Sequence, residues 1–257
     1  MENEVHAASP GRYRSGLYRT TARVVGAVYL AGFVVGIVGN GLIQSILGAP
    51  NHLSTVSANS IMLTIGAILW LMAVVGDVAH GVLMFPVLKP HGERLAIGYF
   101  GARIVDAVFI AVMVLFILLQ IPLGSEYLKA AASDAFYLQA LSTVSVQASQ
   151  YAYAIGMSTL GLAGLMLCST LYRAKLVPRP LAVWGLVGYA IIFCGMVSEV
   201  MGSGLGLASS IPGGLWEAFM GVWLIAKGFS SSPMPSERTT SSTTPRRDSP
   251  EVGSAAA

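Results

Sequence analysis

Residues 61–88 read IMLTIGAILWLMAVVGDVAHGVLMFPVL and contain only two ionisable side chains, Asp77 and His80. A helix that crosses the hydrocarbon core of a bilayer needs about 20 consecutive, mostly apolar residues. This stretch is long enough and apolar enough to be such a helix. A spanning β-structure is excluded, because an open sheet edge in lipid would leave backbone groups unpaired. The stretch therefore predicts an all-α membrane protein.

Five more runs of the same character flank this stretch, so the sequence predicts six transmembrane helices. The six runs are Val24–Leu47, Ile61–Leu88, Ile97–Ile121, Leu141–Tyr172, Leu181–Met201 and Gly213–Phe229. Gly, Pro and Asn residues that favour turns separate the runs. Pro212 is expected at the start of the sixth helix, where its missing N–H costs little.

The composition of the whole chain agrees with a membrane protein. Of its 257 residues, 54% are hydrophobic and 11% are charged, and the mean hydropathy is +0.69. A soluble domain typically carries about 25% charged residues. This balance excludes an ordinary soluble globule, a disordered chain and a nucleic-acid-binding protein. Two cysteines are too few for a disulfide or zinc framework, and nothing in the sequence predicts a metal ion or a cofactor.

Positive charge sorts the predicted loops onto two sides of the membrane. Of the 15 Lys and Arg residues, only Lys129 falls on one side when six crossings are assumed. Cytoplasmic loops carry the excess of Lys and Arg, so both termini are predicted to be cytoplasmic. The expected protein is a multi-pass protein of the cytoplasmic membrane. Its segments are a cytoplasmic N-terminal segment at 1–22, a six-helix transmembrane domain at 23–229 and a disordered Ser/Thr/Pro-rich cytoplasmic tail at 230–257.

A first group of ionisable side chains is expected in the inner half of the membrane. Charged groups in hydrocarbon usually face the bundle interior and find partners there. The group consists of Asp77 and His80 on the second predicted helix and Arg103 and Asp106 on the third. Each pair is spaced three residues apart and so lies on one helix face. The pattern favours a charge-compensated clamp between two helices, and the alternative is a titrating histidine. A metal site is disfavoured because the arginine would repel a cation.

A second group is expected in the outer half, where no basic residue lies at the same depth. It contains the carboxyls Glu199 and Glu217, the amides Asn40, Gln44, Gln147 and Gln150, and the phenols Tyr151 and Tyr153. A carboxyl buried without a cationic partner favours its neutral form and can act as a general acid. We expect the two carboxyls to share a pocket, about 5–8 Å apart, with the amides and phenols binding a ligand. For Glu217 the alternative is simple stabilisation by the start of its helix.

The first predicted helix also carries a stripe of small residues at Gly32 and Gly36, which Asn40 extends. Stripes of this kind let neighbouring transmembrane helices approach closely. The stripe therefore predicts a close helix–helix contact, and a ligand-binding role is the alternative.

Four short motifs give the chain a family resemblance. They are ARVVGAVYL at 22–30, Asp77 ahead of LKP at 88–90, Arg103 with an acid three residues on, and Glu217 ahead of WLIAKG at 223–228. With these motifs, residues 20–229 resemble a bacterial integral-membrane family known only as domain-of-unknown-function family 4386. The resemblance implies a six-helix bacterial membrane protein and supplies no reaction, ligand or cofactor. Asp106 stands where the family more usually has Glu, and His80 is not a family feature.

Three functions remain open. The sharpest hypothesis is intramembrane acid–base chemistry, an isomerisation or cyclisation of a lipophilic small molecule, with Glu199 and Glu217 as catalytic residues. The alternatives are a proton-coupled small-molecule transporter and a non-catalytic sensor or assembly component. A transporter of six helices without a visible repeat would need a homodimer to form a pathway. The expected partners are membrane lipid or a lipophilic small molecule, and no nucleic acid.

Overall fold

The computed structural model describes residues 10–230, and within this range it contains helices and loops but no strand. The elements are α1 Pro10–Leu47, α2 His52–Ala58, α3 Ser60–Leu88, η1 Lys89–His91, α4 Glu93–Leu118, α5 Gln120–Tyr127, α6 Ala132–Arg173, α7 Arg179–Val200 and α8 Gly206–Ala226. Five segments are long and apolar enough to cross a membrane, namely Tyr18–Leu47, Ser60–His91, Glu93–Tyr127, Ala132–Arg173 and Arg179–Val200. The predicted all-α, membrane-type architecture is confirmed at this level.

The helix α8 is not among the five spanning segments, and it carries several polar residues. Ser209, Ser210 and Glu217 lie in it together with Pro212. The helix starts at Gly206, seven residues before the predicted start, so Pro212 lies inside it rather than ahead of it. The preceding turn uses Gly202 and Gly204, whose φ angles of 86° and 69° favour glycine.

Helix boundaries differ from the predicted ones mainly at polar ends. The helix α1 begins at Pro10 instead of Val24, and α6 begins at Ala132 instead of Leu141. The short helices α2 and α5 replace stretches predicted as loops. Polar helical turns outside the lipid carry no apolar signal, so a search for apolar runs misses them. The predicted tail at 230–257 lies outside the described residues from 231 onward.

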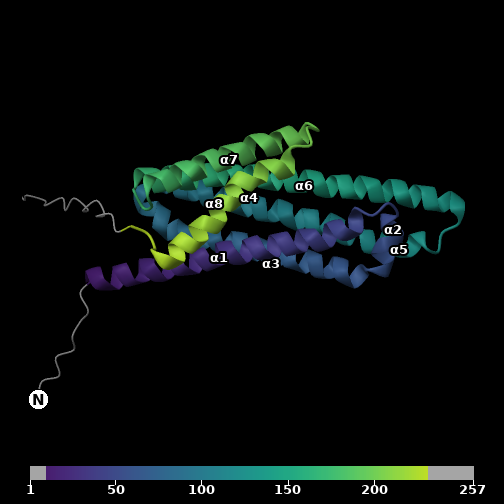
Figure 1. Cartoon of the computed structure of the whole chain (residues 1–257), viewed down its shortest axis with the longest axis horizontal. Helices are drawn as coiled ribbons and strands as arrows, with labels where there is room; N and C mark the ends of the chain where they lie inside the picture. Colours follow the sequence, from purple (N-terminus) through teal and green to yellow (C-terminus); the bar gives the residue numbers. More distant parts are fainter. Residues whose placement is uncertain (1–9, 231–257) are drawn as a thin grey trace, which may run out of the picture.

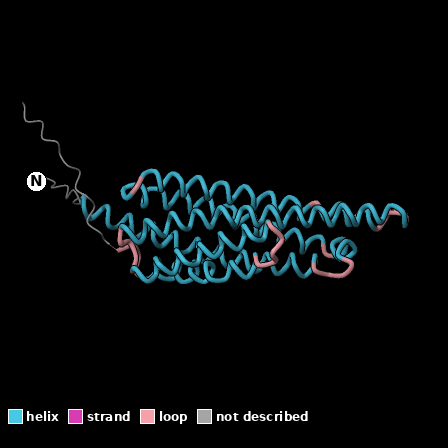
Figure 2. The backbone as a smooth tube through the Cα atoms, turned by 90° about the horizontal axis from the view of Figure 1, so that it is seen from above, coloured by secondary structure: helices cyan, strands magenta, loops and turns pink. Residues whose placement is uncertain are grey.

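The long helices form a closed ring in chain order (Figure 1). The helix α1 contacts α3, α3 contacts α4, α4 contacts α6, α6 contacts α7, and α8 packs between α7 and α1. The view from above shows the helices running along the long axis, with loops at both ends and also partway along the molecule (Figure 2). We call the end with η1 and the loop between α6 and α7 the terminal end, and the opposite end the far end.

Close packing of the ring depends on glycines at positions other than the predicted stripe. A Cβ atom on Gly26 would lie 2.6 Å from the carbonyl oxygen of Gly221, so α1 and α8 touch backbone to backbone. A Cβ atom on Gly32 or Gly36 would meet nothing within 4 Å. The predicted helix contact at Gly32 and Gly36 is therefore wrong, and open space lies beside them instead.

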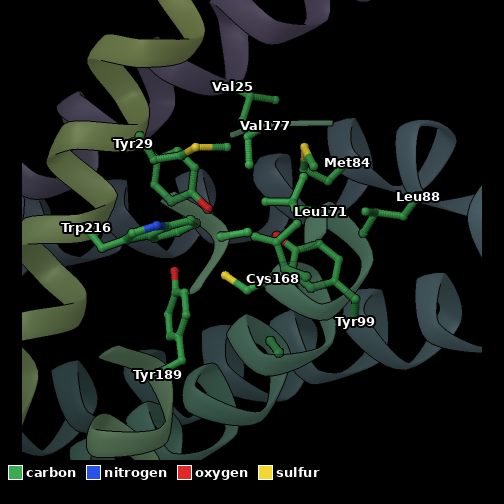
Figure 3. Packing of buried hydrophobic residues seen from close by; sticks show 14 of the residues in the cluster. Val25, Tyr29, Met84, Leu88, Tyr99, Cys168, Leu171, Val177, Tyr189 and Trp216 are labelled. Atoms are coloured by element: carbon green, nitrogen blue, oxygen red, sulfur yellow. The ribbon is translucent and has the colours of Figure 1, made fainter. Parts of the chain in front are cut away.

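Apolar side chains fill the terminal half of the ring (Figure 3). We call this cluster the terminal plug, and it includes Val25, Met84, Leu88, Leu171 and Val177. Each of these side chains is at least 98% buried. Packing of this density leaves no room for water, so the interior is sealed toward the terminal end.

Candidate functional site

Polar side chains gather in the middle of the ring, just beyond the terminal plug. We call this group the polar core; it comprises Tyr29, Asp77, His80, Tyr99, Arg103, Asp106, Tyr189 and Glu217. Asp77 and Glu217 are partly exposed, and the other members are buried. The core draws on α1, α3, α4, α7 and α8, so the closed ring is what assembles it.

Arg103 sits between two carboxylates. One of its terminal nitrogens lies 2.5 Å from an Asp77 oxygen, and the other lies 3.6 Å from an Asp106 oxygen. Asp106 is 1% exposed, and neither of its carboxylate oxygens has a hydrogen-bond partner. The guanidinium therefore joins α3 to α4 and leaves Asp106 with an ion pair but no hydrogen bond.

His80 belongs to the polar core but not to its ion pairs. Its Nδ1 is hydrogen-bonded to the hydroxyl of Tyr99, and its ring meets the ring of Tyr29 edge-on, with centroids 4.2 Å apart. The buried Nε2 has no partner. Sequence spacing grouped His80 with Asp77, but the structure places the imidazole among aromatic side chains.

Glu217 lies at the depth of His80 rather than in the outer half. The hydroxyl of Tyr189 donates a 2.7 Å hydrogen bond to its carboxylate. The neighbouring Trp216 packs against Tyr29 and Tyr189, with centroids 6.2 and 5.3 Å apart (Figure 3). Since Tyr29 also touches His80, these contacts fix Glu217 in the polar core.

Glu199 lies elsewhere, at the far end of α7. Its carboxylate accepts a 2.8 Å hydrogen bond from the backbone N–H of Gly206, the first residue of α8. Ten residues of α7 separate Glu199 from Tyr189, the partner of Glu217, which is about 15 Å along the helix. The expected shared pocket of Glu199 and Glu217 is therefore not formed, because α8 begins earlier than predicted and carries Glu217 deeper. A catalytic role for either residue stays a prediction.

The other predicted ligand-binding residues separate into two sets. Asn40 and Tyr153 are partly buried, whereas the exposed set is Gln44, Gln147, Gln150 and Tyr151. The face of α6 that packs inward carries small residues such as Ser145 and Ser149, and the two glutamines of α6 lie on other faces. Tyr153 packs its ring against Trp70, with centroids 5.9 Å apart.

Open space lies beside the polar core on the side away from the terminal plug, although a second buried hydrophobic cluster packs α1, α3 and α4 together farther along. Gly36 and Asn40 follow Tyr29 at helical spacing, so they lie on the face of α1 that points into the ring. Both residues are partly exposed, as are the residues Asp77 and Glu217. The space beside Gly36 and the terminal plug therefore lie on opposite sides of the polar core.

A family described as "Domain of unknown function (DUF4386)" matches residues 24–228. The chain belongs to this family. The match spans every member of the polar core, and it confirms the resemblance seen in the sequence motifs. Comparison with curated proteins found no match, and comparison with solved structures found none either. The family description names no reaction, so the function of this DUF4386 member has to be argued from its polar core.

Charges in the polar core of this family member do not balance. Arg103 forms ion pairs with Asp77 and Asp106 but not with Glu217, and among residues 18–230 no other Lys or Arg forms an ion pair with these three carboxyls. An uncompensated charge inside a membrane costs at least a few kcal/mol. The surplus carboxyls therefore need bound protons or a bound cation.

A second polar cluster, which sequence reasoning missed, lies at the far end. Ser142 donates a 2.5 Å hydrogen bond to Gln120, and the Nε2 of His52 lies 2.7 Å from the same hydroxyl. Ser142 and Gln120 are fully buried. Because the three residues come from α2, α5 and α6, the cluster ties the two short helices to the long one.

Replacing Ser142 with alanine should lower the free energy of unfolding by about 1–3 kcal/mol, because it leaves the buried Gln120 amide oxygen unpaired. Thermal unfolding of the purified protein in detergent measures this effect. The matched control is Ser45→Ala, since the exposed Ser45 hydroxyl bonds only to its own helix at Leu42. Equal melting temperatures for both variants would show that the cluster does not hold the far end.

Proposed function

We propose that this protein is a six-span transporter of the cytoplasmic membrane that couples the movement of a small molecule to protons held in the polar core. The observation that carries the proposal is the excess of carboxyls over the single guanidinium of Arg103 at mid-membrane depth. Membrane carboxylates are the usual proton sites of carriers. A proton on Glu217 or Asp106 removes the charge that the bundle cannot neutralise itself.

Six crossings are supported by the closure of the ring. With 21 residues, α8 is about 32 Å long, which is enough for a hydrocarbon core of about 30 Å. Cytoplasmic termini are supported by the loops, since Lys89, Arg173 and Arg179 lie at the terminal end and Lys129 at the far end. In this orientation the polar core faces the outside and the terminal plug seals the cytoplasmic side.

A carrier rather than a two-acid enzyme follows from how the carboxyls are placed. Glu199 bonds to the start of α8, so the two-carboxyl arrangement behind the enzyme hypothesis is missing. The polar core instead supplies a proton site at mid-depth, as a carrier needs, and the terminal plug closes one side of it. The ring closes within one chain, so the proposal needs no second copy, and the homodimer stays a prediction.

Infrared spectroscopy tests the proposal directly, because a protonated carboxyl has a carbonyl stretching band that an ionised carboxylate lacks. We expect this band in the wild-type protein at neutral pH, shifted when the sample is exchanged into D2O. Glu217→Gln should remove part of the band. Tyr189→Phe should only move it, since the donor to Glu217 is lost while the carboxyl remains.

The control is Glu126→Gln, because Glu126 is exposed and pairs with Lys129 at the protein surface. This variant should keep the wild-type band. A wild-type protein without any protonated-carboxyl band near neutral pH would overturn the proposal, since all three core carboxyls would then be ionised.

A further inference from the structure

We infer that the transported solute is an organic ammonium cation, which binds in the open space between Gly36 and Glu217 and takes the place of a proton. The inference rests on the proposed proton-coupled function and names the class of solute. It depends on three features of the described residues. These are the acidic side chains of the polar core beside the open space, the open space itself and the aromatic side chains that border it.

The polar core beside the open space contains more acidic side chains than its one arginine can neutralise. Asp106 is 1% exposed and has no hydrogen-bond donor on either carboxylate oxygen, and Glu217 receives one hydrogen bond, from Tyr189. Arg103 is held between Asp77 and Asp106. Acid groups of this kind attract a cation and repel an anion, and the attraction is strong where water is scarce.

The space itself is defined by Gly32 and Gly36. A Cβ atom at either position would meet nothing within 4 Å, whereas one at Gly39, farther along α1, would lie 3.3 Å from Trp70. Gly36 lies about 10 Å along α1 from Tyr29, which touches both His80 and Trp216. The opening thus extends from the polar core toward the level of Trp70.

Aromatic rings border the space on the far side. Trp70 of α3 and Tyr153 of α6 meet across the ring interior, with centroids 5.9 Å apart. An ammonium group is attracted to the faces of Trp and Tyr rings, and such rings together with carboxylates recognise quaternary ammonium ligands. A metal ion is a poorer match, because among the described residues no three His, Cys, Asp or Glu side chains are arranged to hold one.

Exchange of an ammonium for a proton keeps the charge of the core constant. The cation forms an ion pair with the carboxylate of Glu217, and the proton that this carboxyl carried leaves to water on the open side. No covalent bond other than the O–H bond breaks. The titratable or charged groups that face this region are Tyr29, Asp77, His80, Tyr99, Arg103, Asp106, Tyr153, Cys168, Tyr189 and Glu217.

Calorimetric titration with benzyltrimethylammonium tests the inference on the full-length protein in detergent. Running it in two buffers of different ionisation enthalpy gives both the affinity and the number of protons released. We expect saturable binding with proton release at neutral pH, and no binding of benzoate, the matched anion. Glu217→Gln should abolish the proton release.

Gly36→Leu should weaken binding about tenfold or more, because its side chain enters the open space, and a tenfold change is 1.4 kcal/mol. The matched control is Gly41→Leu on the same helix; Gly41 is exposed, and a Cβ there also meets nothing within 4 Å. This variant should bind like the wild type, and both variants should keep the wild-type elution volume on size exclusion.

Wild-type protein that does not bind benzyltrimethylammonium, or a Gly36→Leu variant that binds it normally, would overturn the inference. The proposed function would survive either result if the protonated-carboxyl infrared band is present. Loss of that band together with normal ammonium binding would instead leave a cation site that is not coupled to protons. The two proposals therefore fail separately.

Discussion

Replacing Arg103 with leucine should lower the free energy of unfolding by about 3–5 kcal/mol at neutral pH, because breaking a buried ion pair leaves unpaired charge behind. Arg103 is 6% exposed, and its removal strips the ion-pair partner from both Asp77 and Asp106. Lowering the pH should recover part of the lost stability, since protonation of Asp77 and Asp106 removes the charges that have no ion-pair partner in the variant. Thermal unfolding in detergent across a pH series measures both effects.

Two further variants isolate the cause of this loss. Adding Asp77→Asn and Asp106→Asn to the Arg103→Leu variant removes all three charges, so stability should return toward the wild-type value. Lys129→Leu is the surface control, because Lys129 and Glu126 form an exposed pair at 3.0 Å, and such pairs contribute about 0–1 kcal/mol. An Arg103→Leu variant as stable as Lys129→Leu would show that the ion pairs of the polar core carry little energy.

The sequence was enough to predict an all-α, membrane-type architecture, because lipid imposes a strict requirement on length and apolarity. Three of the apolar runs were placed within a few residues at both ends; Ile61–Leu88, for example, became Ser60–Leu88. The errors lie where the helix continues into polar surroundings, as at Pro10 and Ala132. The sixth run was misjudged because Pro212 was taken as a starting residue, although a proline is tolerated inside a membrane helix when neighbouring groups satisfy the freed carbonyl.

Only part of the candidate site was predictable. Spacing of three residues correctly placed Asp77 and Arg103 on facing sides of their helices, and the structure joins them. The depth of Glu217 was not predictable, because it depends on where α8 begins. The phenols of Tyr29, Tyr99 and Tyr189 were missed. A tyrosine in an apolar helix is usually interpreted as a packing residue, and the sequence does not show which group its hydroxyl contacts.

The rotation of α6 about its own axis also explains why the predicted ligand-binding amides of this helix do not line the candidate site. Their distance along the chain suggested a common depth with the outer carboxyl, but depth says nothing about which way a helix is rotated. Contact with α4 selects the face with Ser145, Ser149 and Gly156, so Gln147 and Gln150 end on other faces. Helix rotation is set by packing of small residues, and that packing involves pairs of helices that one sequence does not reveal.

One of the glycines that pack the ring lies directly against a member of the polar core. A Cβ atom on Gly164 would lie 2.1 Å from Cγ of Tyr189, so the ring of Tyr189 rests directly on the backbone of α6. Gly164→Ala should therefore lower the free energy of unfolding by about 1–3 kcal/mol or more, as overpacking does in a dense interior. The same displacement should move the Tyr189 hydroxyl away from Glu217 and shift the infrared band of that carboxyl.

Gly101→Ala is the matched control, because it makes the same substitution in a helix at a position where a Cβ atom meets nothing within 4 Å. It should leave both the melting temperature and the infrared band unchanged, or raise stability slightly, since alanine favours helix more than glycine does. A Gly164→Ala protein with wild-type stability and an unshifted band would mean that Tyr189 can relax without loss. The hydrogen bond to Glu217 would then be set by α7 and α8 alone, and α6 would have no part in positioning the proton site.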